Sequence, residues 1–423
     1  MNDDLFSLSS LRPRAVTTKA AFALLALANV LTAQVDAGGR PAPRAEQFTL
    51  PAGDHDLGAL VDLLGQIRKA KIECDLAGLD PEAKRIHLQS ELRLDADAWS
   101  DVVTIMLRSR DLLLVPEEVT GDGTAAKGAA AATSRVVLVT RNNLKSLMDG
   151  AEGRDPAEVL ARPNQIAMVR SFYDCKKIQA PIAINMSRPF FASVGSLPAM
   201  TLTAENKRIV AVGCTDDVAC WLRYMLAADG QAGATPQAPS PLPAGPETAW
   251  PERDLDVAAF LTETARVLGA NILWRSKETA AAKPVAAGSP RRLGPAAWYV
   301  EATRALRASD IVLVPLDTGR RVFDAVALNG PRQRWATHLA RECTAEQLLA
   351  KDIPIEPVWL LSRVQHVDAM KIVNQLRPTL ARKHGLSVGC FEGGLVFWGL
   401  SDDVASALEV ARTLDVAPPQ SPK

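Results

Sequence analysis

The sequence predicts an α+β protein made of four small mixed modules, arranged as two copies of one module pair. Two observations predict this class: strand-like and helix-like segments interleave along the chain, and the same order of segments occurs twice. The clearest recurrence is IVAVGCTDDVAC, from Ile209, and LVFWGLSDDVAS, from Leu395. Both predict a strand, a turn and the start of a helix, and Asp402 follows Asp216 by 186 residues. We interpret the chain as a tandem duplication.

The first helix of each copy has one apolar face. LGALVDLLGQIRKAKIECD begins at Leu57, and VAAFLTETARVLGANILWR begins 200 residues later, at Val257. Apolar residues recur at helical spacing in both segments, which predicts a helix that is buried on one side and followed by a strand. In the first copy these residues are Leu57, Leu60, Val61, Leu64 and Ile67.

A second helix and a buried strand follow in each copy. WSDVVTIMLRSRDLLLVP, from Trp99, and WYVEATRALRASDIVLVP, from Trp298, share the pattern W…LR..D..LVP. Apolar residues after Trp99 fall on one helical face, and the run from Leu112 to Val115 predicts a short buried strand. Because both tryptophans lie on the apolar face, we interpret them as core residues.

The second module of each copy begins at DPAEVLAR or CTAEQLLAK and ends with the recurrence described first. Between these points, Arg188-Pro189 corresponds to Arg377-Pro378. Thr215 and Ser401 stand where an N-cap hydroxyl is expected, and the paired aspartates follow in the first helical turn. We therefore interpret these aspartates as complements of the helix dipole. Adjacent helical residues point about 100° apart, which disfavours a shared carboxylate or metal site.

The recurrences and the composition between them predict the domain organisation. We expect a signal peptide at 1–37, first modules at 46–145 and 251–335, second modules at 152–228 and 342–416, a Pro/Ala/Gly-rich linker at 229–250 and a disordered tail at 417–423. The Gly- and Ala-rich stretch at 121–134 lies between two predicted strands, so we expect it to be an extended hairpin loop.

Composition limits the classes of function. The 423 residues include 48 basic and 48 acidic ones, which gives a formal net charge of +0. No overall field therefore attracts nucleic acid or an anionic membrane. At the N-terminus, basic residues precede the apolar run AAFALLALANVLTA, from Ala20 to Ala33. This run is short for a membrane span, which favours a cleaved signal peptide, with cleavage after Ala33 or Ala37, over a retained anchor.

The six cysteines do not recur between the copies. Cys74, Cys214 and Cys220 correspond to Trp274, Leu400 and Ser406, which favours buried filling residues over a disulfide framework. If one bridge exists, it joins Cys175 to Cys214 or Cys220, because all three belong to one predicted module. Cys175 is flanked by Asp174 and two lysines, and cations lower a thiol pKa. Without a nearby histidine, however, we expect an ordinary thiol.

No residue of the sequence is predicted to be catalytic, cofactor-binding or metal-binding. His338, His366 and His384 lie near Cys343 and Cys390, but their spacing matches no metal motif. Motifs for nucleotide binding and for serine hydrolases are not found either. The sequence therefore predicts no enzyme and no cofactor.

The chain resembles the periplasmic N-terminal domains of secretins. FTLPAGDHDLGALVDLLGQIRKAKIECD with the LRSRDLLLVP and RVVLVT segments resembles the short domain that secretins share with TonB-dependent transducers. DAMKIVNQLRP, from Asp368, with GGLVFWGLSDDVASALEVARTLD, from Gly393, is similar to the KH-like, NolW-type domain that follows it in the family. The first-copy counterpart is KKIQAPIAINMSRP with RIVAVGCTDDVAC. Secretins continue into a β-rich pore domain, whereas this sequence ends at Lys423, so we expect no outer-membrane channel.

The resemblance implies protein binding. In the family, the first domain docks partner proteins and the KH-like domains pack side by side into rings. We therefore expect a periplasmic, non-catalytic interaction or scaffold protein of a type II or type III secretion system or a type IV pilus machine, with protein partners and self-assembly. The alternatives are a TonB-transducer-like signalling or ligand-sensing module and a thiol-dependent enzyme that uses Cys175 or Cys390.

Overall fold

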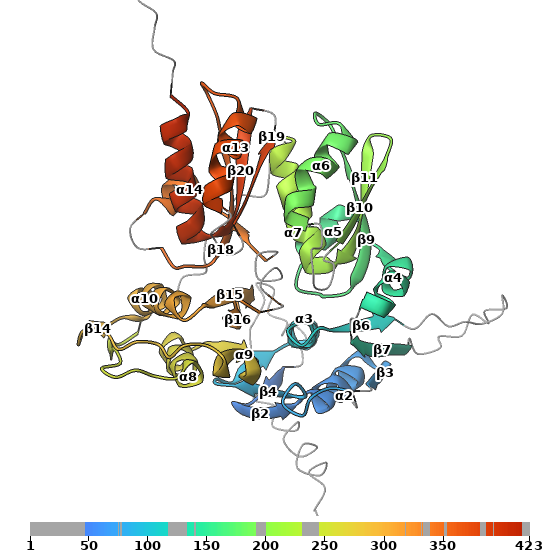
Figure 1. Cartoon of the computed structure of the whole chain (residues 1–423). Coiled ribbons are helices and arrows are strands. Elements are labelled where there is room, and N and C mark those ends of the chain that lie inside the picture. Colours follow the sequence, from blue (N-terminus) through green and yellow to red (C-terminus); the bar gives the residue numbers. More distant parts are fainter. Residues whose placement is uncertain are drawn as a thin grey trace, which may run out of the picture.

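The computed structural model of the chain is an α+β structure of small sheets, each covered by helices (Figure 1). It describes residues 47–416 except 75, 77, 117–132, 139–140, 192–199, 231–244, 318, 331, 333–338, 351–352, 381–385 and 392. We call the elements within 48–138, 152–228, 248–327 and 341–414 modules 1, 2, 3 and 4. Sheet pairing between described strands stays within these modules.

Module 1 pairs strands in three small sheets, of which β3-β7-β6 has β3 parallel to β7 and β6 antiparallel to it. The other two pairs are β1-β5 and β2-β4. Its elements are β1 (Phe48–Leu50), β2 (Gly53–Asp56), α2 (Leu57–Arg68), β3 (Lys71–Cys74), β4 (Arg85–Leu88), β5 (Leu92–Leu94), α3 (Ala96–Arg108), β6 (Leu112–Pro116) and β7 (Thr133–Leu138).

Module 3 repeats the central part of this arrangement. Its sheet β13-β16-β15 again has one parallel and one antiparallel pair, and β12 pairs with β14. A short helix, α9, follows β13, and an isolated bridge between Leu255 and Val285 stands where module 1 pairs β2 with β4. The elements are β12 (Thr248–Ala249), α8 (Val257–Leu268), β13 (Asn271–Trp274), α9 (Ser276–Ala280), β14 (Arg292–Leu293), α10 (Pro295–Ala308), β15 (Ile311–Asp317) and β16 (Val322–Ala327).

Modules 2 and 4 each form one four-stranded sheet, ordered β10-β11-β9-β8 and β19-β20-β18-β17. In both, the short strand at one edge is parallel and the remaining pairs are antiparallel. Helix α4 (Arg141–Asp149) precedes module 2. The elements of module 2 are β8 (Glu152–Gly153), α5 (Pro156–Ala161), β9 (Met168–Asp174), α6 (Ala180–Phe191), β10 (Met200–Glu205), β11 (Arg208–Cys214) and α7 (Thr215–Ala228). Those of module 4 are β17 (Arg341–Glu342), α12 (Ala345–Leu348), β18 (Pro357–Arg363), α13 (Ala369–Leu380), β19 (Ser387–Phe391), β20 (Gly394–Leu400) and α14 (Ser401–Leu414).

The predicted apolar faces form the cores. Leu57, Leu60, Val61 and Leu64 of α2 are buried, as predicted, whereas Ile67 is partly buried. Trp99 and Trp298 are fully buried in modules 1 and 3, which confirms their interpretation as core residues. The predicted strand before Pro116 is β6, and it pairs with β7 across the expected hairpin.

The cores of the two copies are continuous across their contact. Leu273 and Val322 of module 3 belong to the core of module 1, and Trp359, Val396 and Trp398 of module 4 belong to the core of module 2. In Figure 1, modules 2 and 4 lie side by side, above modules 1 and 3. Because apolar side chains are buried between the copies, the two copies are packed against each other and are not independent units held apart by a linker.

The linker expected at 229–250 is shorter at its C-terminal end. β12 lies within that range, and Trp250 packs in the core of module 3 with its ring centroid 4.9 Å from that of Trp298. Burial of an indole outweighs the local Pro and Gly content. The predicted signal peptide, most of the hairpin loop at 121–134 and the tail at 417–423 lie outside the described residues.

None of the helices in the described ranges combines the length and the apolar character that crossing a membrane requires.

Candidate functional site: the contacts that join the modules

A buried ion pair joins the two modules of the first copy. Arg108, the last residue of α3, donates to Asp216 Oδ2 at 3.5 Å and to Asp217 Oδ2 at 3.1 Å, in the first turn of α7. The Asp217 side chain is 0 % exposed. A guanidinium and two carboxylates are thus held in the interior between a helix end and a helix start.

The charges of this cluster balance one another. Burial disfavours the charged form of Arg108, but Cys214, Asp216 and Asp217 outweigh it, so the guanidinium pKa is raised. The pKa of Asp216 is raised by burial and by the neighbouring Asp217 carboxylate, against the effect of Arg108. Removal of Arg108 would leave two carboxylates buried without a cation, which is strongly unfavourable.

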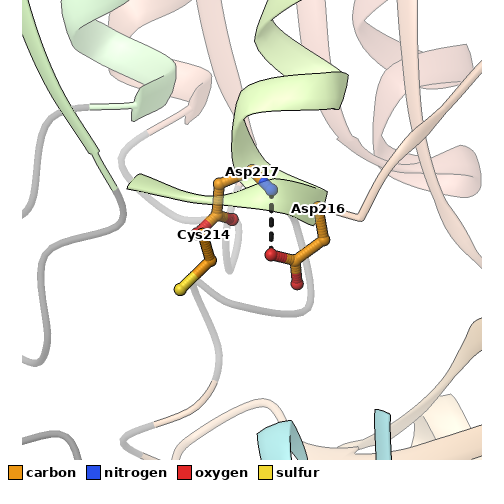
Figure 2. Close-up of side chains that lie close together, drawn as sticks. All are labelled: Cys214, Asp216 and Asp217. Atoms are coloured by element: carbon orange, nitrogen blue, oxygen red, sulfur yellow. Dashed lines mark hydrogen bonds between the residues drawn. The ribbon is translucent and has the colours of Figure 1, made fainter. Parts of the chain in front are cut away.

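The same carboxylates come close to a thiol. The ligand atoms of Cys214, Asp216 and Asp217 all lie within 4.8 Å of one another, and Asp216 Oδ1 accepts a hydrogen bond from the Asp217 backbone N–H (Figure 2). The expectation that adjacent aspartates diverge was therefore wrong here, because the turn from β11 into α7 brings both carboxylates to one side. Burial raises the pKa of Cys214, which disfavours the thiolate that a metal would need.

The second copy repeats this ion pair at the same positions. Arg307 of α10 lies 3.6 Å from Asp402 Oδ2 and 3.1 Å from Asp403 Oδ2. Arg307 corresponds to Arg108 within the shared LR pattern. Sequence reasoning identified both halves of the contact but did not connect them, because the arginine and the aspartates belong to different modules and are separated by about half a copy.

The predicted N-caps at Thr215 and Ser401 were wrong. Cys214 and Leu400 are the N-cap residues, and neither helix has a side-chain cap hydrogen bond. The two hydroxyls instead donate backward, Thr215 to the carbonyl of Ala167 at 3.1 Å and Ser401 to that of Pro354 at 2.8 Å. Each hydroxyl thus binds a carbonyl of the segment before the adjacent strand, and the Ala167 carbonyl also accepts the Thr215 backbone N–H at 3.0 Å.

A second repeated carboxylate was missed by sequence reasoning. At the end of α7, Asp229 accepts three backbone N–H groups, from Lys176 at 2.8 Å, Lys177 at 2.7 Å and Ile178 at 2.8 Å. The Tyr173 hydroxyl also donates to it, at 2.9 Å.

Asp415 binds the corresponding loop of the second copy. It accepts the N–H groups of Gln365, His366 and Val367 at 2.8, 2.7 and 3.0 Å. Each carboxylate fixes the loop that leads into the first long helix of its module. The signal in the sequence was an aspartate at the same distance after each DDVA motif, Asp229 and Asp415.

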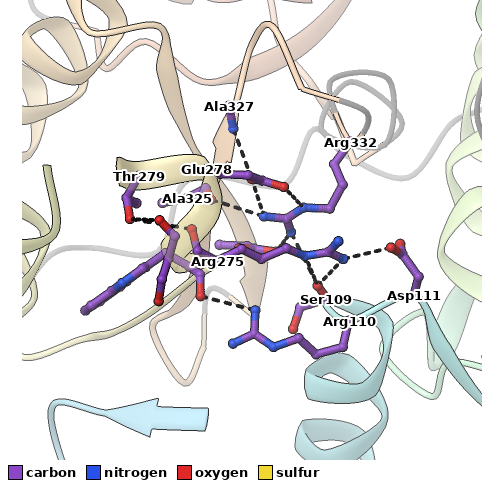
Figure 3. Close-up of polar contacts among 12 residues, drawn as sticks. Ser109, Arg110, Asp111, Arg275, Glu278, Thr279, Ala325, Ala327 and Arg332 are labelled. Atoms are coloured by element: carbon purple, nitrogen blue, oxygen red, sulfur yellow. Dashed lines mark hydrogen bonds and ion pairs between the residues drawn. The ribbon is translucent and has the colours of Figure 1, made fainter. Parts of the chain in front are cut away.

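A polar network joins module 1 to module 3 (Figure 3). The carbonyl of Ser109, at the C-terminus of α3, accepts from Arg275 Nη2 at 2.7 Å and from Arg332 Nη1 at 3.5 Å. Arg275 also pairs with Asp111 at 2.9 Å, and Arg332 pairs with Glu278 at 2.7 Å. Cations at a helix C-terminus are favourable because the carbonyls there carry partial negative charge.

The edge strand β13 is covered by module 1. The Gln89 side-chain amide donates to the carbonyl of Ile272 at 3.0 Å and accepts its N–H at 2.8 Å. The Ser90 N–H donates to Asn271 Oδ1 at 2.9 Å. A side-chain amide thus replaces a neighbouring strand at an edge that would otherwise be exposed.

An aromatic cluster joins module 2 to module 4. The rings of Trp359 and Trp398 stack on the sheet of module 4 with centroids 5.7 Å apart. Phe190, Phe191 and Tyr224 from α6 and α7 cover them, with Phe191 in edge contact with Trp398 at 5.0 Å. All five side chains are buried, so this is a helix face of one module packed on the sheet face of the other.

The cysteines form no disulfide, and the two candidate nucleophiles Cys175 and Cys390 are not activated. No disulfide joins the six cysteines, all of which lie in the described ranges, so the candidate bridge from Cys175 to Cys214 or Cys220 does not form. Burial, Asp229 and Asp174 raise the pKa of Cys175 to about 11, and burial raises that of Cys390. These environments oppose a thiolate nucleophile. His366 is exposed, and His338 and His384 lie outside the described residues.

No protein-family model matches the chain, and no curated protein matches it. Among solved structures, the GspC–GspD complex of the type II secretion system from enterotoxigenic Escherichia coli aligns at 14% identity over 44% of this chain and 99% of that chain, with a TM-score of 0.20.

Two further structures align over most of the chain. A dimeric mutant of the N-terminal domain of the secretin XcpQ from Pseudomonas aeruginosa shares 9% identity over 87% of this chain and 99% of that chain, with a TM-score of 0.19. The Klebsiella pneumoniae outer membrane complex of PulD, PulS and the PulC HR domain shares 11% over 86% of this chain and 50% of that chain, with a TM-score of 0.31. At such TM-scores the likeness says nothing about the activity of this chain.

Proposed function

We propose that the chain is a periplasmic, non-catalytic scaffold of an envelope secretion or pilus-type machine, formed by tandem duplication of a secretin-like module pair. The duplication is supported by the matching sheet orders, by the two Arg–Asp–Asp ion pairs and by the two loop-binding aspartates. Periplasmic location is supported by the signal-like N-terminal sequence.

The observation that carries the proposal is the packing of module 2 on module 4. Their contact is heterologous, because a helix face meets a sheet face. The contact uses the helix face of module 2 and the sheet face of module 4. The sheet face of module 2 and the helix face of module 4 are not used by it and lie at the two ends of the module pair. Arg170 is exposed on that sheet face, and Val410 is 40% exposed on that helix face. These surfaces are suited to a second protein or a second copy.

Module 2 also offers a strand edge. β10 is the last strand in its sheet, and four of its six residues are exposed. An unpaired strand edge can bind an extended segment of a partner by backbone hydrogen bonds.

Site-specific crosslinking in the cell envelope tests the proposal. A photoreactive amino acid is placed at Thr203, exposed on β10, and in a second variant at Thr413, exposed on α14 near Val410, to probe the helix face of module 4. We expect defined adducts from position 203, with a secretion or pilus component or with a second copy. Absence of adducts from both positions, with the protein folded and exported, would contradict the scaffold proposal.

A further inference from the structure

A cleft of about 960 Å³ lies between modules 1 and 3. Its walls come from β4 and residues 80–83 on one side and from residues 272–283 on the other. Arg110, just after α3, also lines it and is 7% exposed, less than any other charged residue of the cleft. The cleft is therefore built by both copies around a buried guanidinium.

Arg110 has only neutral partners among the described residues. Its Nη1 donates to the carbonyl of Trp274 at 3.1 Å and its Nη2 to that of Arg85 at 3.2 Å, while its buried Nε has no hydrogen-bond partner. The adjacent Arg275 and Arg332 are both paired with carboxylates (Figure 3). Arg110 is thus the one guanidinium of this network without a hydrogen bond to a carboxylate among the described residues, although Asp324 and Glu278 attract it electrostatically.

The environment of Arg110 is unfavourable for its charge. Burial lowers its pKa to about 10, and Arg275 and Arg332 strengthen this effect, whereas Asp324 and Glu278 oppose it. These carboxylates do not hydrogen-bond to Arg110, so a carboxylate brought by a ligand would add a charge-assisted hydrogen bond to a buried guanidinium.

The other lining residues narrow the ligand class. The half-buried Trp274 stands beside His87, with ring centroids 6.3 Å apart, and offers an apolar surface. Acidic and basic side chains alternate in the rest of the lining, so the cleft has no concentrated positive charge that would favour a ligand with several negative charges. The Arg110 guanidinium is hydrogen-bonded to the backbone carbonyl of Trp274, so it lies next to that residue. A ligand that contacts both must therefore carry its anion and its apolar group close together. A peptide C-terminus carries both on one Cα atom.

We propose that this cleft binds the C-terminus of a partner protein that ends in an aromatic or large aliphatic residue. The terminal carboxylate pairs with Arg110 and the last side chain packs against Trp274. That the ligand belongs to a protein rests on the proposed scaffold function, whereas the chemistry of the cleft does not.

Binding of synthetic peptides to the purified full chain tests this inference. The probes are a labelled hexapeptide that ends in Phe as the free acid, the same peptide as the C-terminal amide, and an amide with an internal Glu before the Phe. We expect the free acid to bind at least about tenfold more tightly than both amides. Equal affinities, or no binding of any peptide, would overturn the proposal, and tight binding of the Glu-containing amide would overturn the assignment to a chain end.

Two variants locate the effect. Arg110→Met should abolish the preference for the free acid, whereas Lys277→Met, at an exposed position of the same cleft, should retain it. Retained preference in Arg110→Met would overturn the proposal. If that variant does not fold, a photoreactive group on the last peptide residue decides the matter in the wild-type chain. We expect the photoreactive peptide to label residues 272–283. Labelling confined to other segments would contradict the assignment of the peptide site to this cleft.

These outcomes separate the two proposals. If no peptide binds but position 203 gives adducts, the peptide-binding cleft is rejected and the scaffold proposal stands. If the free-acid peptide binds but position 203 gives no adducts, the scaffold role of β10 is rejected.

Discussion

Modules 2 and 4 have the same sheet order but opposite roles at their outer sheet faces. In module 4 this face carries Trp359 and Trp398, which are paired across β18 and β20 and buried under the helices of module 2. The corresponding pair in module 2 is Arg170 and Val212, of which the first is exposed and the second half-buried. Equivalent backbones thus carry an internal interface in one copy and an open surface in the other.

The two Arg–Asp–Asp ion pairs also differ in how deeply they are buried. The Arg108 side chain is 10% exposed and Asp216 7%, whereas Arg307 is 19% exposed and the equivalent Asp402 38%; the second aspartate, Asp217 or Asp403, is buried in both copies. A buried ion pair depends far more on both partners than an exposed one. The comparison teaches that repeated residues preserve the local geometry, while burial sets how much each contact contributes to stability.

The largest effect is expected at the aromatic cluster. Trp398→Ala should lower the free energy of unfolding by about 4 kcal/mol, because a fully packed indole leaves a cavity between two modules. Val212→Ala, at the equivalent position of module 2, should cost under about 1 kcal/mol. Urea unfolding of both variants measures the difference. Similar losses would mean that the two faces are not used differently.

A smaller effect is expected at the inter-module ion pairs. Arg108→Met should destabilise the fold by about 3 kcal/mol, because two buried carboxylates lose their cation. Arg307→Met should cost less, about 2 kcal/mol, since Asp403 is buried but Asp402 retains contact with solvent. Thermal unfolding followed by circular dichroism measures both. A larger loss for Arg307→Met would reverse the order that burial predicts.

The loop-binding aspartates come next. Asp229→Asn should cost about 2 kcal/mol, because a neutral amide replaces a buried charge that accepts four hydrogen bonds. Asp415→Asn should cost under about 1 kcal/mol because water can compensate at a half-buried site. Hydrogen exchange at the backbone N–H groups of residues 176–178 and 365–367 reports each loop separately. Equal protection losses in both loops would contradict the comparison.

The smallest effect is the pH dependence of stability that Asp415 contributes. Burial acts to raise the pKa of Asp415, but the N–H groups of Gln365, His366 and Val367 outweigh it and hold the pKa below the ordinary 3.8. The folded state therefore binds this proton less tightly than the unfolded state. The resulting stabilisation is complete above the unfolded pKa and disappears as the pH falls through the folded pKa.

Comparison of the wild-type chain with Asp415→Asn between about pH 6 and about pH 2 isolates this contribution. The stability difference should shrink toward the acid end. A difference that grows as the pH falls would show that the sign is wrong.

Much of the fold could be predicted because its elements have local causes. The helical spacing of Leu57, Leu60 and Leu64 predicted a buried face, and the run before Pro116 predicted a strand. The N-caps could not be predicted, since Thr215 and Ser401 bond to carbonyls of a neighbouring segment that the fold brings near. Trp250 was assigned to the linker for a similar reason, because its partner Trp298 lies 48 residues further along the chain.

The contacts of the candidate site needed long-range information. The sequence by itself determined the repeated order of elements and the repeated charges, because helical and strand periodicity and residue identity are local properties. Only the tertiary structure decided that Arg108 meets Asp216 and Asp217, that the indoles of module 4 lie under module 2 and that Arg110 hydrogen-bonds only to carbonyls in a cleft between the copies. The physical reason is that burial depends on which surfaces meet, and burial decides what each charge and each aromatic ring contributes.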